Sequence, residues 1–183
     1  DAVAAYQTAG RIEHLFFLPI ISVATALVTL VGMFYGAKRL DLIRTIVKYG
    51  LTRAIAISLS FSVFFLFFSG SILPAFTDSP EIIRLSVLYF KIMAFAYPFI
   101  TIGMTSTRIM QGLGVAYPMF ILTLFRVVII SASLAWYFVI VLEKPVYYAW
   151  VGTLISCIIT AGVSLFWLRS ILRRSFKSVV ETV

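Results

Sequence analysis

Charged side chains placed inside apolar runs are the residues of this chain with the clearest capacity for chemistry. Arg126 interrupts the stretch "FILTLFRVVIISASLAWYFVIVL" about eight residues inside a predicted helix, roughly 12 Å deep at 1.5 Å per residue. Because a charge in lipid is costly, its guanidinium should face other helices or water. We expect either a substrate or gating contact or, as the favoured interpretation, a structural role in which Arg126 reaches headgroups or caps a neighbouring helix end.

A second group of ionisable residues lies near the start of the chain, at Arg11, Glu13 and His14. About 37 Å of helix separate Glu13 from Lys38, which exceeds the roughly 30 Å hydrocarbon core, so helix tilt decides their depth. The i, i+4, i+7 spacing places Gln7, Arg11 and His14 on one helix face, while Glu13 points elsewhere. His14 either titrates near neutral pH or is an inert interfacial residue.

Lys91 on a later predicted helix has a similar depth to Glu13. It lies about 26 Å from Arg108 at the same helical rise. We predict that Glu13 and Lys91 form a pair across an outward-facing cavity, where they would bind substrate or take part in proton coupling. The alternative is two interfacial charges that headgroups solvate.

The segment "AYPFITIGMTSTR" combines a proline with small and hydroxyl-bearing residues. Proline kinks a helix, and broken helices are where many transporters bind and bend, so Pro98 and, in the first helix, Pro19 are hinge candidates. We expect Gly103 and Ser106 to serve helix packing. Aromatic and flexible side chains suit a polyspecific cavity. The substrate-contact candidates in this segment are Tyr97, Thr101 and Met104.

The composition indicates that lipid is the solvent for these elements. The chain has 183 residues, of which 62% are hydrophobic and 12% charged, against roughly 45–50% and 25% in soluble domains. The net charge of +8 is divided among short clusters between apolar runs, a pattern typical of membrane topology rather than of nucleic-acid binding. The sequence contains one cysteine and no recognisable Ser-His-Asp set, phosphate loop or metal-ligand spacing, so we expect neither an enzyme nor a metal site.

Apolar runs long enough to cross a bilayer, about 20 residues each, predict one all-α transmembrane domain over residues 1–183. The stretch "RLDLIRTIVKY" between the first two runs predicts a separate amphipathic helix on the membrane surface. The five predicted spans cover approximately residues 3–36, 54–76, 80–111, 118–142 and 146–172.

Lysine and arginine in the connections predict the orientation of the spans. The basic segments "GAKRLDLIRTIVKYGLTR", "RIMQGLG" and "LRSILRRSFKSVV" would share the cytoplasmic side. We therefore expect the first residue outside and the last inside a cell membrane. The chain begins with Asp1, and five spans starting outside are natural for the final part of a longer protein, so we expect a fragment.

Two long segments resemble a known family. "VAAYQTAGRIEHLFFLPIISVATALVTLVGMFYGAKR" resembles the second helix of each half of the multidrug and toxic compound extrusion (MATE) transporters, with its Ala-rich entry, Arg-Ile and basic Gly-Ala exit. "RIMQGLGVAYPMFILTLFRVVIISASLAWYFV" is similar to the family's fourth-to-fifth helix segment, where a Gly-x-Gly turn leads to a proline and an apolar helix carrying one arginine. "GMFYG" departs from the Gln and Asn common in the family, which puts a polar role of that loop in doubt.

The resemblance implies five helices of a six-helix lobe, the second of two, with the first helix of that lobe missing. It implies export of cationic or amphipathic organic compounds in exchange for Na⁺ or H⁺ by rocking of the two lobes. The partners would be the bilayer, the missing N-terminal lobe and small organic substrates, with no nucleic acid. We expect no cofactor, and we expect the coupling ion to bind mainly outside this chain.

Two other functions remain open at this point. A lipid-linked oligosaccharide or polysaccharide flippase of the same superfamily would use a larger and more cationic cavity, which Arg11, Lys91 and Arg126 allow. A non-transporting, half-size membrane protein is the second alternative.

Overall fold

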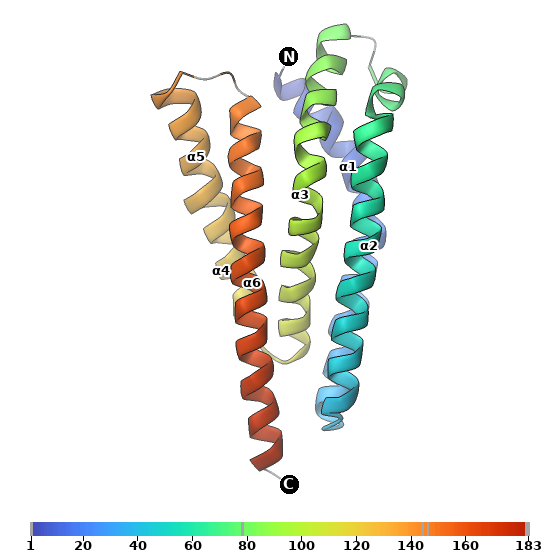
Figure 1. Ribbon diagram of the computed structural model, residues 1–183, viewed down its shortest axis with the longest axis vertical. Coiled ribbons are helices and arrows are strands. Elements are labelled where there is room, and N and C mark those ends of the chain that lie inside the picture. The colour runs from blue at the N-terminus through green and yellow to red at the C-terminus, as the bar shows by residue number, and fades with distance from the viewer. Residues whose placement is uncertain (1, 78, 144, 146, 182–183) are drawn as a thin grey trace.

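The computed structural model describes residues 2–77, 79–143, 145 and 147–181, and these residues form an all-helical bundle. The long helices are α1 (Ala2–Gly36), α2 (Leu40–Ile72), α3 (Pro80–Gly112) and α6 (Tyr147–Glu181). A short 3₁₀ turn, Leu73–Ala75, ends α2. Spans that follow one another in the chain run in opposite directions, so the start of α1 and the end of α6 lie at opposite ends of the bundle (Figure 1).

The remaining span is one rod made of alternating helical types. It begins as α4 (Tyr117–Leu124), widens into a π-helical segment (Phe125–Ala132), continues as α5 (Ser133–Trp136) and ends in a second π-helical segment (Tyr137–Val141). With this rod, the described residues contain five helices that are long and apolar enough to cross a membrane. The all-α, five-span fold predicted from the sequence is confirmed.

Large aromatic side chains on the outside of the bundle show why lipid must surround it. Phe67 is 78% exposed and Phe166 is 77% exposed. Isolated exposed apolar residues are ordinary in soluble proteins, but a surface of this kind over every span fits a hydrocarbon solvent.

The start of α2 differs from the predicted surface helix. The residues from Leu40 onward continue without a break into the second span, which therefore begins near residue 40 instead of residue 54. Ile43 and Val47 are buried against Leu27 and Val31 of α1, so the amphipathic pattern reflects helix packing and not a membrane surface. The prediction of a separate helix is wrong because packing against protein and lying on lipid give the same apolar stripe.

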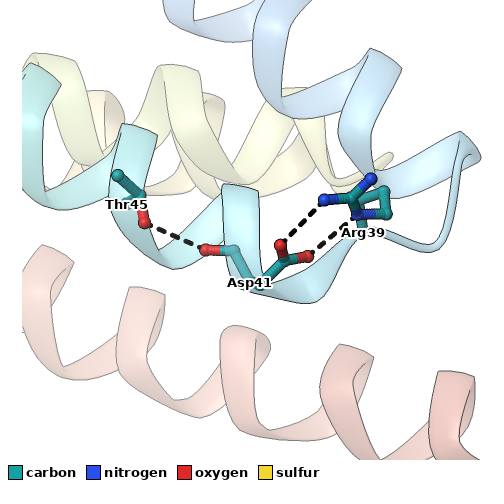
Figure 2. Close-up of polar contacts among 3 residues, drawn as sticks. All are labelled: Arg39, Asp41 and Thr45. Carbon is teal, nitrogen blue, oxygen red and sulfur yellow. Dashed lines mark hydrogen bonds and ion pairs between the residues drawn. The ribbon is translucent and has the colours of Figure 1, made fainter.

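A polar cluster lies at the turn between α1 and α2. The Arg39 guanidinium donates to both carboxylate oxygens of Asp41 at 3.2 and 3.0 Å, and Thr45 Oγ1 donates to the Asp41 carbonyl oxygen at 3.1 Å (Figure 2). The hydrogen bond and negative charge of Asp41 raise the pKa of Arg39 above its ordinary value. Both side chains are exposed, so the pair fixes local geometry more than it stabilises the fold.

Helix α3 is the central element, because it packs against α1, α2 and α6. An upper core surrounds its first half, where Phe65 of α2 stacks on Phe90 with ring centroids 4.5 Å apart. A lower core surrounds its second half, where Ile109 and Met110 are fully buried.

Small residues permit the close crossing of α1 and α3 at the lower end. A Cβ atom on Gly112 would lie 2.7 Å from the carbonyl oxygen of Val28, and one on Gly32 would lie 3.4 Å from the carbonyl oxygen of Gly112. Gly36, four residues after Gly32, faces open space. Gly32 of the Gly-x-x-x-Gly pair therefore contributes to packing within the bundle, and Gly36 does not.

Both hinge candidates lie inside long helices, Pro19 in α1 and Pro98 in α3. The upper part of α1 slants behind α3 before the helix descends beside α2 (Figure 1). A proline in a helix interior removes one backbone hydrogen bond, which allows such a change of direction. Bending during function stays a prediction.

Candidate functional site

Glu13 of α1 and Tyr89 of α3 form the main polar contact between distant helices in the described structure. The Tyr89 hydroxyl donates to Glu13 Oε2 at 2.8 Å. Tyr89 is 3% exposed, and its ring packs edge-on against Tyr6 at 5.6 Å and against Trp150 of α6 at 5.3 Å. The carboxyl group therefore lies where α1, α3 and α6 meet.

The helical repeat explains why these two side chains meet. On α1, Ala9 and Ile12 are buried, and Glu13 follows Ala9 by four residues on the same inward face. On α3, Tyr89, Met93 and Tyr97 recur every four residues and belong to one core cluster. Glu13 thus enters an aromatic environment in which the one described hydrogen-bond partner of its carboxylate is a neutral hydroxyl group.

The predicted pair between Glu13 and Lys91 is not formed. Lys91 lies two residues after Tyr89, and at about 100° per residue it points to nearly the opposite side of α3. Its side chain is exposed and lines a surface pocket together with Glu81 and Arg84. Within the described residues an ion pair is formed instead by Arg39 and Asp41, far along the chain from Glu13.

Gln7, Arg11 and His14 are exposed and line one shallow depression on the outside of α1. The predicted common face is therefore confirmed, as is the different direction of Glu13. The structure does not bring Arg11 or His14 to the Glu13–Tyr89 contact. A role for either residue in binding or coupling stays a prediction.

Hydroxyl groups continue along α3 beyond Tyr89. The hydroxyl oxygens of Tyr97, Thr101, Thr105 and Ser106 are buried and, within the described structure, have no hydrogen-bond partner. Such groups are costly to leave unsatisfied, so they mark a place where water, an ion or another polar group is favoured. Tyr97 and Thr101 are 1% and 0% exposed, so a substrate could reach them only after helices separate.

Arg126 lies at a second site, which is formed by α3, by α6 and by the span that begins with α4. Its Nη1 donates to the Sγ of Cys157 at 3.7 Å, and it borders a cavity of about 160 Å³. Met104 and Gly103 of α3 also line this cavity. Gly103 thus leaves open space and does not provide the close packing that was expected.

Sequence reasoning missed the partners of the two inward charges. Tyr89 is 76 residues from Glu13, and Cys157 is 31 residues from Arg126. The repeat of Tyr89, Met93 and Tyr97 at four-residue intervals could have indicated an inward aromatic face. A single cysteine gives no comparable signal. Among the described residues there is no group of three or more His, Cys, Asp or Glu side chains that could hold a metal ion.

The chain is similar to members of a known protein family. The family model MatE matches residues 1–137. A probable multidrug resistance protein NorM from Thermotoga maritima is 23% identical over 170 residues, which cover 93% of this chain and 37% of that protein.

Two solved structures share the fold. An outward-facing multidrug resistance MATE family transporter of the MOP superfamily is 26% identical with a TM-score of 0.88, covering 96% of this chain and 39% of the other. An inward-facing one is 24% identical with a TM-score of 0.86, covering 94% and 40%. The chain therefore spans about two fifths of the length of these proteins.

Proposed function

Because this chain belongs to the MatE family, we propose that it is one lobe of a secondary antiporter that exports cationic or amphipathic organic compounds. Na⁺ or H⁺ entry would drive the export. The similar proteins are named for multidrug resistance, which supports this substrate class. The rest of the transporter would supply a second lobe, and the substrate path would lie between the two.

The observation that supports a rocking mechanism is the nearly equal similarity of the fold to two transport states. The TM-scores to the outward-facing and inward-facing structures are 0.88 and 0.86. An internal rearrangement of this helical unit between the states would lower one of the two scores. This supports movement of the unit as a nearly rigid body, as rocking-type alternating access requires.

The orientation follows from where the bundle collects its basic segments. The connection after α1, the connection after α3 and the end of α6 lie toward the same end of the bundle (Figure 1). We place this end in the cytoplasm, because lysine and arginine accumulate on that side of membrane proteins. The start of α1 then lies on the outer side of the cell membrane.

Glu13 is the residue in this lobe with the chemistry to couple ion and substrate movement. A carboxyl group inside a membrane bundle can exchange a proton or bind Na⁺, and intramembrane carboxylates have these roles in other transporters. Tyr89 holds the group at 2.8 Å without neutralising it. Release of that hydrogen bond would be one way to alternate between an occluded and an accessible carboxyl group.

The test is ethidium efflux from cells that express the complete transporter. We expect Glu13→Gln to abolish or strongly reduce efflux at unchanged expression. Glu81→Gln is the matched control, because it makes the same change at an exposed carboxylate at the start of α3. Full efflux in Glu13→Gln would show that a group outside this lobe couples ion and substrate movement. Absence of efflux from the unaltered transporter would contradict the proposed export of cations.

A further inference from the structure

The cavity beside Arg126 has a composition that differs from a site for cations. Its walls are mainly apolar, formed by Phe99 and Ile100 of α3 and by Met119 and Leu122 of α4. Arg126 is the one charged side chain among its described lining residues. A positively charged ligand would be repelled here, so this cavity is not explained by the proposed export of cations.

The guanidinium of Arg126 has an incomplete set of partners. It carries five N–H donors, while the contact described for it is one 3.7 Å approach to the neutral sulfur of Cys157. Among the described residues that line the cavity there is no carboxylate. A cation inside a membrane bundle without a negative partner is unfavourable, so an anionic oxygen group would gain from binding there.

Two of the three threonine hydroxyl groups that line the cavity do not compete as donors. Thr107 Oγ1 donates to the Met104 carbonyl oxygen and Thr160 Oγ1 donates to the Ser156 carbonyl oxygen, each at 2.8 Å. Their protons are therefore occupied within their own helices. Thr123 also lines the cavity, but among the described lining residues the charged donors all belong to Arg126.

The backbone at Arg126 is also unusual. The residue lies in the π-helical segment Phe125–Ala132, and such segments within helices are frequent at functional sites. On the opposite wall, a Cβ atom on Gly103 would meet nothing within 4 Å. The two features together leave space next to the charge.

We propose that this cavity binds a small amphiphilic carboxylate, with its anionic group on Arg126 and its apolar body between α3 and α4. The volume of about 160 Å³ is close to that of an apolar cavity able to hold one benzene ring. Benzoate therefore fits both the size and the chemistry. The site does not depend on transport, so binding can be measured independently of the proposed export.

The depth of Arg126 in the membrane favours a free carboxylate over a lipid headgroup as the ligand. Arg126 lies nine positions after Tyr117, the first residue of α4, which places it about 13 Å along the helix. This is close to the middle of a hydrocarbon core about 30 Å thick. The phosphate of a bilayer lipid stays at the interface, so a free carboxylate is the expected occupant.

The experiment measures binding of benzoate to the complete protein in phosphatidylcholine nanodiscs by calorimetry. We expect saturable binding of benzoate and none of benzylamine, which has the same ring and the opposite charge. Arg126→Gln should weaken benzoate binding by about tenfold or more. Arg169→Gln, which alters an exposed arginine on α6 outside the cavity, should leave it unchanged.

Gly103→Leu provides a second variant that keeps the charge and fills the cavity. It should also block binding, and the open space at Gly103 makes the change compatible with folding. Benzoate should further slow the reaction of Cys157 with methyl methanethiosulfonate, read by mass spectrometry of the peptide that contains it. This protection should disappear in Gly103→Leu.

Two results would overturn the assignment. One is benzoate affinity that is unchanged in Gly103→Leu, or equal binding of benzylamine and benzoate. The other is loss of benzoate binding when phosphatidylglycerol replaces part of the zwitterionic phosphatidylcholine, because the anionic lipid headgroup would then compete for the site.

Discussion

At the scale of single residues, the two inward charges of this chain have neutral partners. Glu13 accepts a hydrogen bond from Tyr89, and Arg126 contacts the thiol of Cys157. A charge next to a neutral partner stays available for an ion or ligand, whereas a salt bridge would satisfy it internally. Both sites therefore suit exchange of a proton, ion or ligand more than a permanent structural lock.

The hydroxyl group of Tyr89 should stabilise the bundle through Glu13. Tyr89→Phe removes the donor and leaves the carboxyl group without its described partner, which should cost about 1–3 kcal/mol. The thermal midpoint of the purified, complete protein in detergent measures this loss. Tyr117→Phe is the control, because Tyr117 is 57% exposed. A larger drop of the thermal midpoint in Lys91→Ala than in Tyr89→Phe would instead indicate that Glu13 pairs with Lys91.

At the scale of elements, α3 organises the lobe because every other long helix depends on it. Helices α1 and α2 pack on one side and α6 on another, so both cores are built around one central helix. The contacts at its lower end require a glycine, and those at the start of α2 require apolar side chains. Each requirement gives a separate prediction.

The crossing of α1 and α3 should depend on Gly112. In Gly112→Ala the new methyl group would lie 2.7 Å from the Val28 carbonyl oxygen, so the helices must separate at a cost of about 1–3 kcal/mol. Gly36→Ala should be neutral or slightly stabilising, since its side faces open space and alanine favours helix. The thermal midpoints of these two variants measure the difference in stability. Equal values would contradict the close crossing of α1 and α3.

The first turns of α2 should behave as protein core. Ile43→Ser places a polar group at a position that is 0% exposed and removes a packed side chain, so we expect a loss of about 2–5 kcal/mol. Tyr49→Ser on the same helix is the control, because Tyr49 is 57% exposed. Heat-induced loss of monodisperse protein in gel filtration would report the difference. A helix lying on the membrane surface would instead tolerate both changes similarly.

At the scale of the whole molecule, the fold of this chain resembles an outward-facing and an inward-facing structure of other proteins. The similarity to outward-facing and inward-facing structures is almost the same. Movement relative to a second lobe then needs no repacking of either core, which agrees with the general difficulty of deforming a packed interior continuously.

The proposed orientation predicts which ends of the bundle react from outside. A cysteine replacing Glu81, at the start of α3, should react with a membrane-impermeant maleimide in intact cells. A cysteine replacing Ala37, in the connection after α1, should react only after the membrane is permeabilised. The reverse pattern would invert the orientation, and the unaltered protein with buried Cys157 serves as the background control.

The sequence by itself determined that this is a helical membrane protein and which family it resembles. Long apolar runs, the clustering of basic residues and the segments around Glu13 and Arg126 carry that information locally. The same local signals left α2 wrongly divided, because an amphipathic stripe does not tell lipid from protein as the apolar partner. They also could not predict that Phe65 is buried and Phe67 exposed, with exposed fractions of 1% and 78%.

Only the tertiary structure decided what each charge touches. Tyr89 and Lys91 are two residues apart, yet the helical twist directs one toward Glu13 and the other to the surface. The cavity at Arg126 needs α3, the α4 rod and α6 to meet, and Gly103 matters only as the space it leaves on the opposite wall. Partners that are distant in the chain are fixed by helix rotation and crossing, which arise from packing of the whole bundle and leave no mark in a local stretch of sequence.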